Sequence, residues 1–242
     1  MKIFQRAAVF LLVLLLVSCR AGMVRPSTPA ARFGGRSITV VVDAGHGGED
    51  CGATGVNGVR EKDLNFSVAN QVTEMLLFAG VPAVRTRTED KLLYRPEENI
   101  PGRKKSYDLR NRLLATEEWK NPVLLSIHMN NFTQEKYSGF QVYYSVRHPD
   151  SRVLAEKLQA DVVRQLQPEN RRQAKAGDSS IYLLDRAICP ALLAECGFLS
   201  NCEECEKLCE EDYQKQLSFL LFCAMIDYSE EEPEEPPEKG AL

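Results

Sequence analysis

Two of the three histidines in the chain directly follow stretches that are typical of buried β-strands. His46 lies in a glycine-rich segment after the first stretch, and His128 follows a second. Glu61 opens a helical segment after His46, and Glu195 ends a short apolar strand. Two histidines and a carboxylate are a common zinc ligand set that leaves one coordination position for water. Zinc lowers the pKa of such water to about 7, and a second carboxylate then moves its proton.

These residues by themselves leave their roles open. A lone histidine after a strand is usually structural, and Glu61 could be a first-turn charge favoured by the helix dipole. Glu195 could be a proton carrier whose apolar strand raises its pKa, or a buried carboxylate paired with an arginine. The coincidence of two strand-end histidines makes the metal interpretation about as strong as the structural one. The third histidine, His148, lies in a turn-like segment and is interpreted as a surface residue.

The elements that must position these residues alternate between strand and helix. Apolar runs predict strands at 38–43, 81–86, 123–127, 140–146, 181–184 and 191–194; helical spacing predicts helices at 61–79, 107–119, 151–166 and 212–228, with a long surface loop at 88–106. This order predicts a single-domain α/β fold with a twisted, largely parallel or mixed sheet of about six strands flanked by helices. Ligands of open α/β sheets bind beyond the carboxyl ends of the strands, where the candidate residues lie.

The two ends of the chain differ from the middle. A basic flank and an apolar run lead to Leu16-Val17-Ser18-Cys19, which resembles the lipobox of bacterial lipoproteins. Residues 1–19 are therefore predicted to be a signal peptide that exports the protein and tethers it to the membrane through acylated Cys19. An uncleaved anchor helix is the alternative. Residues 20–37 are predicted to be a flexible linker, 38–228 the catalytic domain, and the glutamate- and proline-rich residues 229–242 a disordered acidic tail.

Charge and cysteine content narrow the function classes. The net charge of −4 argues against a nucleic-acid binder that works by neutralising phosphates. Of the eight cysteines, seven lie beyond Cys19, an odd number that cannot all pair within one chain. Cys202, Cys205 and Cys209 would share a helix face, but a metal cluster needs a fourth ligand, so packing thiols or a local disulfide are favoured. Packing is also the favoured interpretation of Cys51 and Cys196.

Four motifs resemble those of the zinc-dependent N-acetylmuramoyl-L-alanine amidases of the amidase-3 family. They are Val42-Asp-Ala-Gly-His-Gly-Gly48, Glu61-Lys-Asp-Leu-Asn65, Ser126-Ile-His-Met-Asn130 and Leu193-Ala-Glu-Cys-Gly-Phe-Leu-Ser-Asn201. Their order and spacing agree over residues 38–228. The resemblance implies one Zn²⁺ ion held by His46, Glu61 and His128, with Glu195 as the catalytic glutamate. Arg112 stands where the family has an arginine before the histidine-bearing strand, and the resemblance assigns it no role. Ala44 replaces the usual proline.

Members of that family hydrolyse the amide between the lactyl group of N-acetylmuramic acid and L-alanine of the peptidoglycan stem peptide. Further segments resemble the spore germination-specific branch: Arg103–Arg110, Ser138–Gln141, Arg171–Lys175 and Ile181–Leu184. That branch strips stem peptides from spore cortex so that a deacetylase can make muramic-δ-lactam, and in some anaerobes it works with a lipoprotein partner. The resemblance therefore implies a peptidoglycan substrate and a place on the outer face of the cytoplasmic membrane, in the cell wall or in the forespore intermembrane space.

Three other functions fit parts of the pattern. A vegetative cell-wall autolysin would use the same chemistry on a different peptidoglycan. A catalytically inactive peptidoglycan-binding module would keep the fold, although such modules usually lose a ligand and all four positions are filled here. A metallopeptidase acting on ordinary proteins would accept the same ligand set, although the chain has no HExxH helix.

Overall fold

The computed structural model describes residues 35–231. The predictions for the signal peptide, Cys19, most of the linker and most of the acidic tail lie outside these residues. The strands are β1 (Thr39–Ala44), β2 (Ala83–Arg85), β3 (Pro122–Asn130), β4 (Gln141–Tyr144), β5 (Lys175–Ala176) and β6 (Ala191–Phe198). The helices are α2 (Glu61–Phe78), α3 (Lys104–Glu117), α4 (Pro149–Gln165), α5 (Tyr182–Arg186), α6 (Cys202–Cys209) and α7 (Glu211–Glu230), with a 3₁₀ turn, η1, at Pro96–Glu98.

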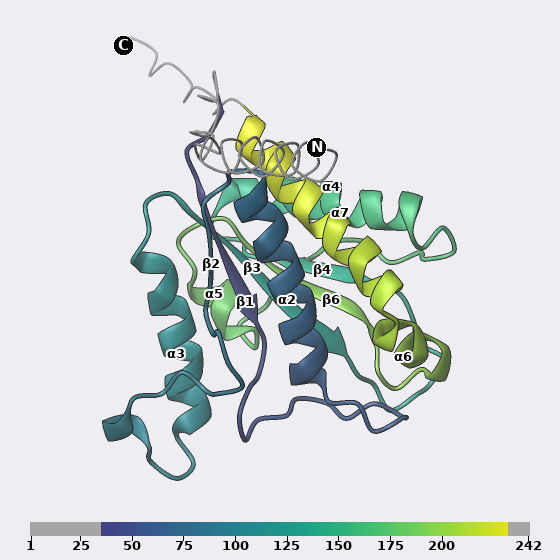
Figure 1. Ribbon diagram of the computed structural model, residues 1–242, viewed down its shortest axis with the longest axis horizontal. Coiled ribbons are helices and arrows are strands. Elements are labelled where there is room, and N and C mark those ends of the chain that lie inside the picture. Colours follow the sequence, from purple (N-terminus) through teal and green to yellow (C-terminus); the bar gives the residue numbers. More distant parts are fainter. Residues whose placement is uncertain (1–34, 232–242) are drawn as a thin grey trace, which may run out of the picture. The chain divides into compact units, whose positions relative to one another are not determined.

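The strands form one six-stranded sheet in the order β2-β1-β3-β6-β4-β5 (Figure 1). The pairs β2–β1, β1–β3 and β3–β6 are parallel, whereas β4 runs antiparallel to β6 and parallel to β5. The predicted α/β fold with a mixed sheet is therefore confirmed. Because β1, β3 and β6 are parallel neighbours, their carboxyl ends meet at one edge of the sheet.

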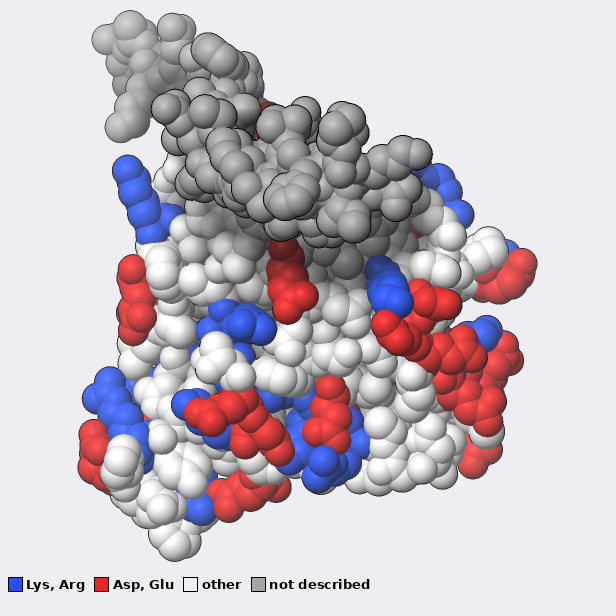
Figure 2. All heavy atoms as spheres, in the orientation of Figure 1, with Lys and Arg blue, Asp and Glu red and all other residues white. Residues whose placement is uncertain are grey.

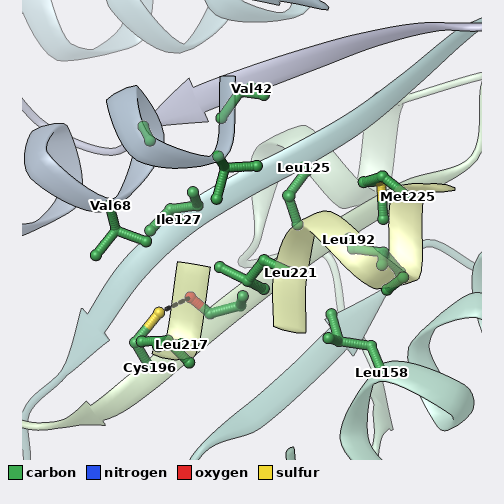
Figure 3. Close-up of a cluster of buried hydrophobic side chains, with 14 of the residues drawn as sticks. Val42, Val68, Leu125, Ile127, Leu158, Leu192, Cys196, Leu217, Leu221 and Met225 are labelled. Atoms are coloured by element: carbon green, nitrogen blue, oxygen red, sulfur yellow. Dashed lines mark hydrogen bonds between the residues drawn. The ribbon is translucent and has the colours of Figure 1, made fainter. Parts of the chain in front are cut away.

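Helices cover both faces of this sheet. On one face α2, α4 and α7 pack over a core that Figure 3 shows in part, with Val42, Leu125 and Leu192 from the strands opposite Val68 of α2 and Leu221 of α7. A smaller apolar cluster lies on the other face, under α3 and α5. Burial on both faces explains why the central strands are continuous Val and Leu runs.

The predicted strand at 181–184 is wrong, because Tyr182–Arg186 forms the short helix α5. Leu183 and Leu184 are buried there, and a short apolar run does not distinguish a buried helix turn from a strand. The sixth strand is β5, an exposed two-residue segment with no apolar signal in the sequence.

Several predicted boundaries also move. His128 and Glu195 were expected at strand ends, but β3 continues to Asn130 and β6 to Phe198. The predicted loop at 88–106 contains η1 and the start of α3, and α7 continues to Glu230.

The described surface is mixed in charge. Figure 2 shows acidic and basic side chains interspersed on the face that carries α2 and α7, with acidic residues gathered near α6. None of the helices between residues 35 and 231 combines the length and apolarity needed to cross a bilayer.

Candidate metal centre

The three candidate ligands meet at the carboxyl ends of β1 and β3. His46 lies just beyond β1, Glu61 is the first residue of α2, and His128 lies within β3. His46 Nε2 is 3.2 Å from Glu61 Oε1, and His128 Nδ1 is 3.0 Å from the same oxygen. All three ligand atoms lie within 4.8 Å of one another, and no other group of three such side chains does so among residues 35–231.

The backbone around His46 is shaped to admit these side chains. The amide of Gly45 donates to Ile127 O at 3.0 Å, which places Gly45 beside His128. A Cβ at Gly45 would lie 2.2 Å from His128 Cε1, so the imidazole occupies the space that any larger residue would need. His46 itself has φ 61°, a left-handed conformation that is uncommon for a residue with a side chain.

Glu61 is held by hydrogen bonds to both carboxylate oxygens. Oε2 accepts from the amide of Ala53 at 2.8 Å, and Oε1 accepts from the amide of Met129 at 3.2 Å. Burial acts to raise the pKa of Glu61, but the neighbouring His128 and His46 hold it well below its usual range. Glu61 is therefore ionised at neutral pH, and its carboxylate lies between the two rings as an anionic ligand.

His46 has a second carboxylate on its outer nitrogen. Nδ1 lies 3.0 Å from Asp50 Oδ2, and Lys105 lies 3.3 Å from the same oxygen. Burial acts to lower the pKa of His46, but Glu61 and Asp50 raise it. Metal-binding histidines usually have such a partner, which fixes the ring and its tautomer. Asp50 was not identified from the sequence; its position four residues after His46 is the signal that could have suggested it.

Arg112, whose role the sequence left open, anchors the start of the metal loop. Its guanidinium donates to Asp43 Oδ1 at 2.6 Å, to the carbonyl of Ala44 at 2.7 Å and to the carbonyl of His46 at 2.7 Å. Asp108, one turn earlier on α3, accepts from Arg112 Nε at 2.7 Å. The three contacts to Asp43, Ala44 and His46 tie α3 to the segment that carries His46, and the contact with Asp108 within α3 holds the guanidinium in place.

Two further buried cations support the same loop, and neither was identified from the sequence. Arg87 donates to the carbonyl of Ala44 at 3.0 Å and to that of Lys62 at 2.8 Å. Lys62 is only 4% exposed and donates to the carbonyl of Gly48 at 2.7 Å and to Asp90 at 2.6 Å. Nothing in the local sequence separates Arg87 from an ordinary surface arginine, and the Glu61–Asn65 motif that contains Lys62 does not by itself indicate that this lysine is buried.

The ligand set fits a zinc ion by chemistry and by spacing. Ligands about 2.0–2.1 Å from a tetrahedral ion lie about 3.3–3.4 Å apart. The separations of 3.0 and 3.2 Å between Glu61 Oε1 and the two imidazole nitrogens are close to that value. Two neutral imidazoles and one ionised carboxylate are also ligands that zinc commonly takes.

Glu195 lies beside the metal ligands. It pairs with His128 in the register of β3 and β6, so both side chains point to the same face of the sheet. Its Oε2 is buried and has no hydrogen-bond partner among the described residues. Burial raises the pKa of Glu195 to about 7, with Glu61 adding to the rise and His128 opposing it. The predicted rise is therefore confirmed, and no arginine ion pair to Glu195 is present between residues 35 and 231.

The other sequence candidates lie apart from this centre. His148 is the N-cap of α4, and its ring accepts from the amide of Asp150. Cys196 is fully buried in the core. Cys202, Cys205 and Cys209 lie on α6, but only Cys205 is buried. The packing interpretation is therefore confirmed for Cys205 and wrong for the exposed Cys202 and Cys209, and the cysteines of residues 35–231 are free thiols.

Comparison with known proteins identifies the family to which the chain is similar. Residues 40–225 match the family model for N-acetylmuramoyl-L-alanine amidases. The germination-specific N-acetylmuramoyl-L-alanine amidase of Bacillus subtilis is 31% identical over 82% of this chain and 82% of its own length. The amidase LytC of B. subtilis is 26% identical over 78% of this chain but only 35% of its own length. The CwlD amidase of Clostridioides difficile, solved in complex with the GerS lipoprotein, is 36% identical with a TM-score of 0.73, covering 78% of this chain and 97% of that one.

Proposed function

Because the chain belongs to the N-acetylmuramoyl-L-alanine amidase family, we propose that it hydrolyses the muramoyl–L-alanine amide of peptidoglycan with one zinc ion. His46, Glu61 and His128 would hold the ion, and Glu195 would carry the proton. The observation that carries this proposal is the convergence of His46 Nε2, His128 Nδ1 and Glu61 Oε1 beside the unpartnered carboxyl of Glu195.

A zinc ion held by His46, Glu61 and His128 would supply water that is activated near neutral pH and would polarise the scissile carbonyl. The carboxylate of Glu195 takes a proton from the attacking water and delivers it to the leaving nitrogen of L-alanine. A pKa of about 7 suits both steps, because a group poised near the working pH both accepts and donates readily. The C–N bond breaks to give the lactyl carboxylic acid and the amine of L-alanine, and Glu195 returns to its starting carboxylate. The proton of the new acid then passes to the amine, so the products leave as a carboxylate and an ammonium group.

We further propose that the substrate is spore cortex and that the enzyme is exported and tethered through its N-terminus. The lengths of the relatives support the spore assignment. The germination-specific relative aligns over most of both chains, whereas the match to LytC covers only about a third of LytC. The complex of CwlD with a lipoprotein supports a lipoprotein partner for this chain as well. A vegetative autolysin role is the alternative.

The test is mass spectrometry of muropeptides digested by the purified full chain before chelation, after chelation and after zinc is restored. We expect stem peptides with a free L-alanine amino terminus only when zinc is present, and muramic acid left with a free lactyl carboxylate. Peptide release that survives complete zinc removal would contradict the proposal. Cleavage of casein but not muropeptides would instead indicate a peptidase, and cleavage of vegetative but not cortex peptidoglycan would contradict the cortex assignment.

A further inference from the structure

Two segments that resemble the germination branch, Ser138–Gln141 and Arg171–Lys175, join beside Glu195. Arg172 Nε donates to the carbonyl of Ser138 at 2.8 Å, and Arg172 Nη1 donates to Gln141 Oε1 at 2.8 Å. Gln141 in turn donates through Nε2 to the carbonyl of Gln173 at 3.0 Å. The proposed hydrolysis does not use either segment, so their meeting point needs its own explanation.

Arg172 is held in one orientation while part of its guanidinium stays available. Its Cζ lies 4.5 Å from the centre of the Phe198 ring, which fixes the plane of the group in addition to the bonds at Nε and Nη1. Nη2 has no partner among residues 35–231. A guanidinium with a fixed plane and a free edge is suited to bind a carboxylate.

The position of this group follows from the register of the sheet. Gln141 of β4 pairs with Glu195 of β6, and Glu195 pairs with His128 of β3. Neighbouring strands lie about 4.8 Å apart. The order across the sheet edge is therefore metal ligand, Glu195, Gln141 and then Arg172, which Gln141 contacts directly.

That order fixes which half of the substrate lies over β4. Glu195 must contact the leaving nitrogen in order to protonate it, so the peptide half extends from Glu195 away from His128, toward Arg172. One to two strand spacings correspond to about 5–10 Å, and two extended residues span about 7 Å. A carboxylate on the second residue of the leaving peptide would therefore reach the guanidinium.

We propose that Arg172, oriented by Gln141 and Phe198, forms a binding site for a carboxylate of the leaving stem peptide and so selects peptides that are acidic at their second residue. This inference rests on the proposed amidase function. Arg172 acts on the bound peptide and takes no part in the proton transfer.

The test compares two substrates that differ by one group. They are N-acetylmuramoyl-L-alanyl-D-glutamate with its γ-carboxyl blocked as the methylamide, and N-acetylmuramoyl-L-alanyl-D-isoglutamine blocked in the same way, in which a carboxamide replaces the one remaining carboxylate. We expect zinc-loaded wild-type protein to prefer the free acid by about 10- to 100-fold in kcat/KM, the range for a hydrogen bond to a charged group. The preference should lie mainly in KM. Arg172→Gln should remove the preference, whereas Arg171→Gln should keep it, because Arg171 is an exposed neighbour that bonds only to Pro168 and Glu169 among the described residues.

A second measurement needs no variant, so poor folding of Arg172→Gln would not block the test. The product L-alanyl-D-glutamate γ-methylamide should inhibit the wild-type protein at least about 10-fold more strongly than L-alanyl-D-isoglutamine γ-methylamide, which has no side-chain or α-carboxylate on its second residue. Equal kcat/KM and equal inhibition for the acid and the carboxamide would overturn the inference alone. Failure to cleave either substrate with zinc present would overturn the proposed function, and the inference with it. An equal loss on both substrates in Arg172→Gln would show a structural role and also overturn the inference.

Discussion

Glu195 owes its chemistry to where it is buried. Its neighbours in β6 are core residues, its Oε2 has no partner among residues 35–231, and its pKa rises to about 7. A carboxyl group on the surface would stay ionised at neutral pH and would be a poor proton donor to a leaving amine.

Glu195→Gln keeps the size of the side chain but removes its ability to carry a proton. We expect kcat to fall by about 10²- to 10⁴-fold, the usual contribution of a general acid–base group. Zinc content, measured by inductively coupled plasma mass spectrometry, should stay at one ion per chain, because Glu195 is not among the three ligands. A variant that keeps more than a tenth of wild-type kcat would contradict the role of Glu195.

At this scale the sequence predicted the residues that carry chemistry and missed those that orient them. His46, Glu61, His128 and Glu195 stand in recognisable motifs, and the structure brings all four together. Asp50 and Arg87 stand in no recognised motif, and Lys62 stands in the Glu61–Asn65 motif without a role that the motif indicates. The contacts of these residues join segments up to 43 residues apart. Only the folded chain brings those segments together.

Contacts between elements keep the metal loop in place. Asp43 at the end of β1 and Arg112 of α3 form a buried pair at 2.6 Å, and Ser126 of β3 also donates to Asp43 at 2.6 Å. Burial acts to raise the pKa of Asp43, but Arg112, Ser126 and Thr86 lower it to about 2. Three elements are thereby joined at one carboxylate.

Asp43→Asn should reduce the free energy of unfolding by about 3 kcal/mol at pH 7, because it leaves the buried Arg112 short of one partner. The pKa of Asp43 is lower in the folded protein than its ordinary value of 3.8. The ionised carboxylate therefore stabilises the fold fully above pH 3.8, and this stabilisation is lost as the pH falls toward about 2. The gap between wild type and variant should therefore shrink by about 2 kcal/mol over that window. Urea unfolding at a series of pH values measures it, and a gap that is constant with pH would contradict the assignment.

Gly45→Ala tests the close approach of β1 to β3. The added Cβ would lie 2.2 Å from the His128 ring, so the ring must move out of the ligand position. We expect zinc affinity, measured by competition with a chromophoric chelator, to fall by about 10- to 100-fold. This is the usual loss when a metal ligand is no longer held in its orientation. Gly58→Ala is the control, since its Cβ would meet nothing within 4 Å and any cost is confined to backbone strain at φ 85°. Unchanged zinc affinity in Gly45→Ala would contradict the proposed site.

Helices and strands were predictable where the pattern of apolar residues was clear over many residues. The buried strands β1 and β3 and the helices α2 and α7 follow their apolar patterns closely. The short segments were not predictable, because α5 has the apolar run of a strand and β5 has no run at all. Their state is decided by the packing of Leu183 and Leu184 and by pairing with β4.

On the scale of the whole described domain, the metal site and the ends of the described chain lie far apart. α2 begins with the ligand Glu61 and ends at Phe78, about 26 Å away by helix rise. Gly35 and Arg36 lie against the end of α7, where Arg36 contacts Tyr228 and Asp150, and Figure 1 shows this region away from the α2 start.

Removal of residues 232–242 should leave kcat/KM and the melting temperature unchanged, because the last described helix ends at Glu230, remote from Glu61. Removal of residues 1–36 should instead lower the melting temperature, since Arg36 donates to Asp150 at 2.5 Å and stacks on Tyr228. Calorimetry and muropeptide kinetics on both truncations measure this contrast. A loss of activity on removing the tail would contradict it.

The central claim is that two imidazoles and one carboxylate, and no thiol, hold a zinc ion. X-ray absorption at the zinc edge of the loaded protein tests it most directly, because zinc–sulfur bonds of about 2.3 Å are easily distinguished from nitrogen and oxygen ligands at about 2.0–2.2 Å. We predict a shell of nitrogen and oxygen only, with two histidine scattering contributions that fall to one in His128→Ala. A sulfur shell, or a spectrum unchanged in His128→Ala, would contradict the account.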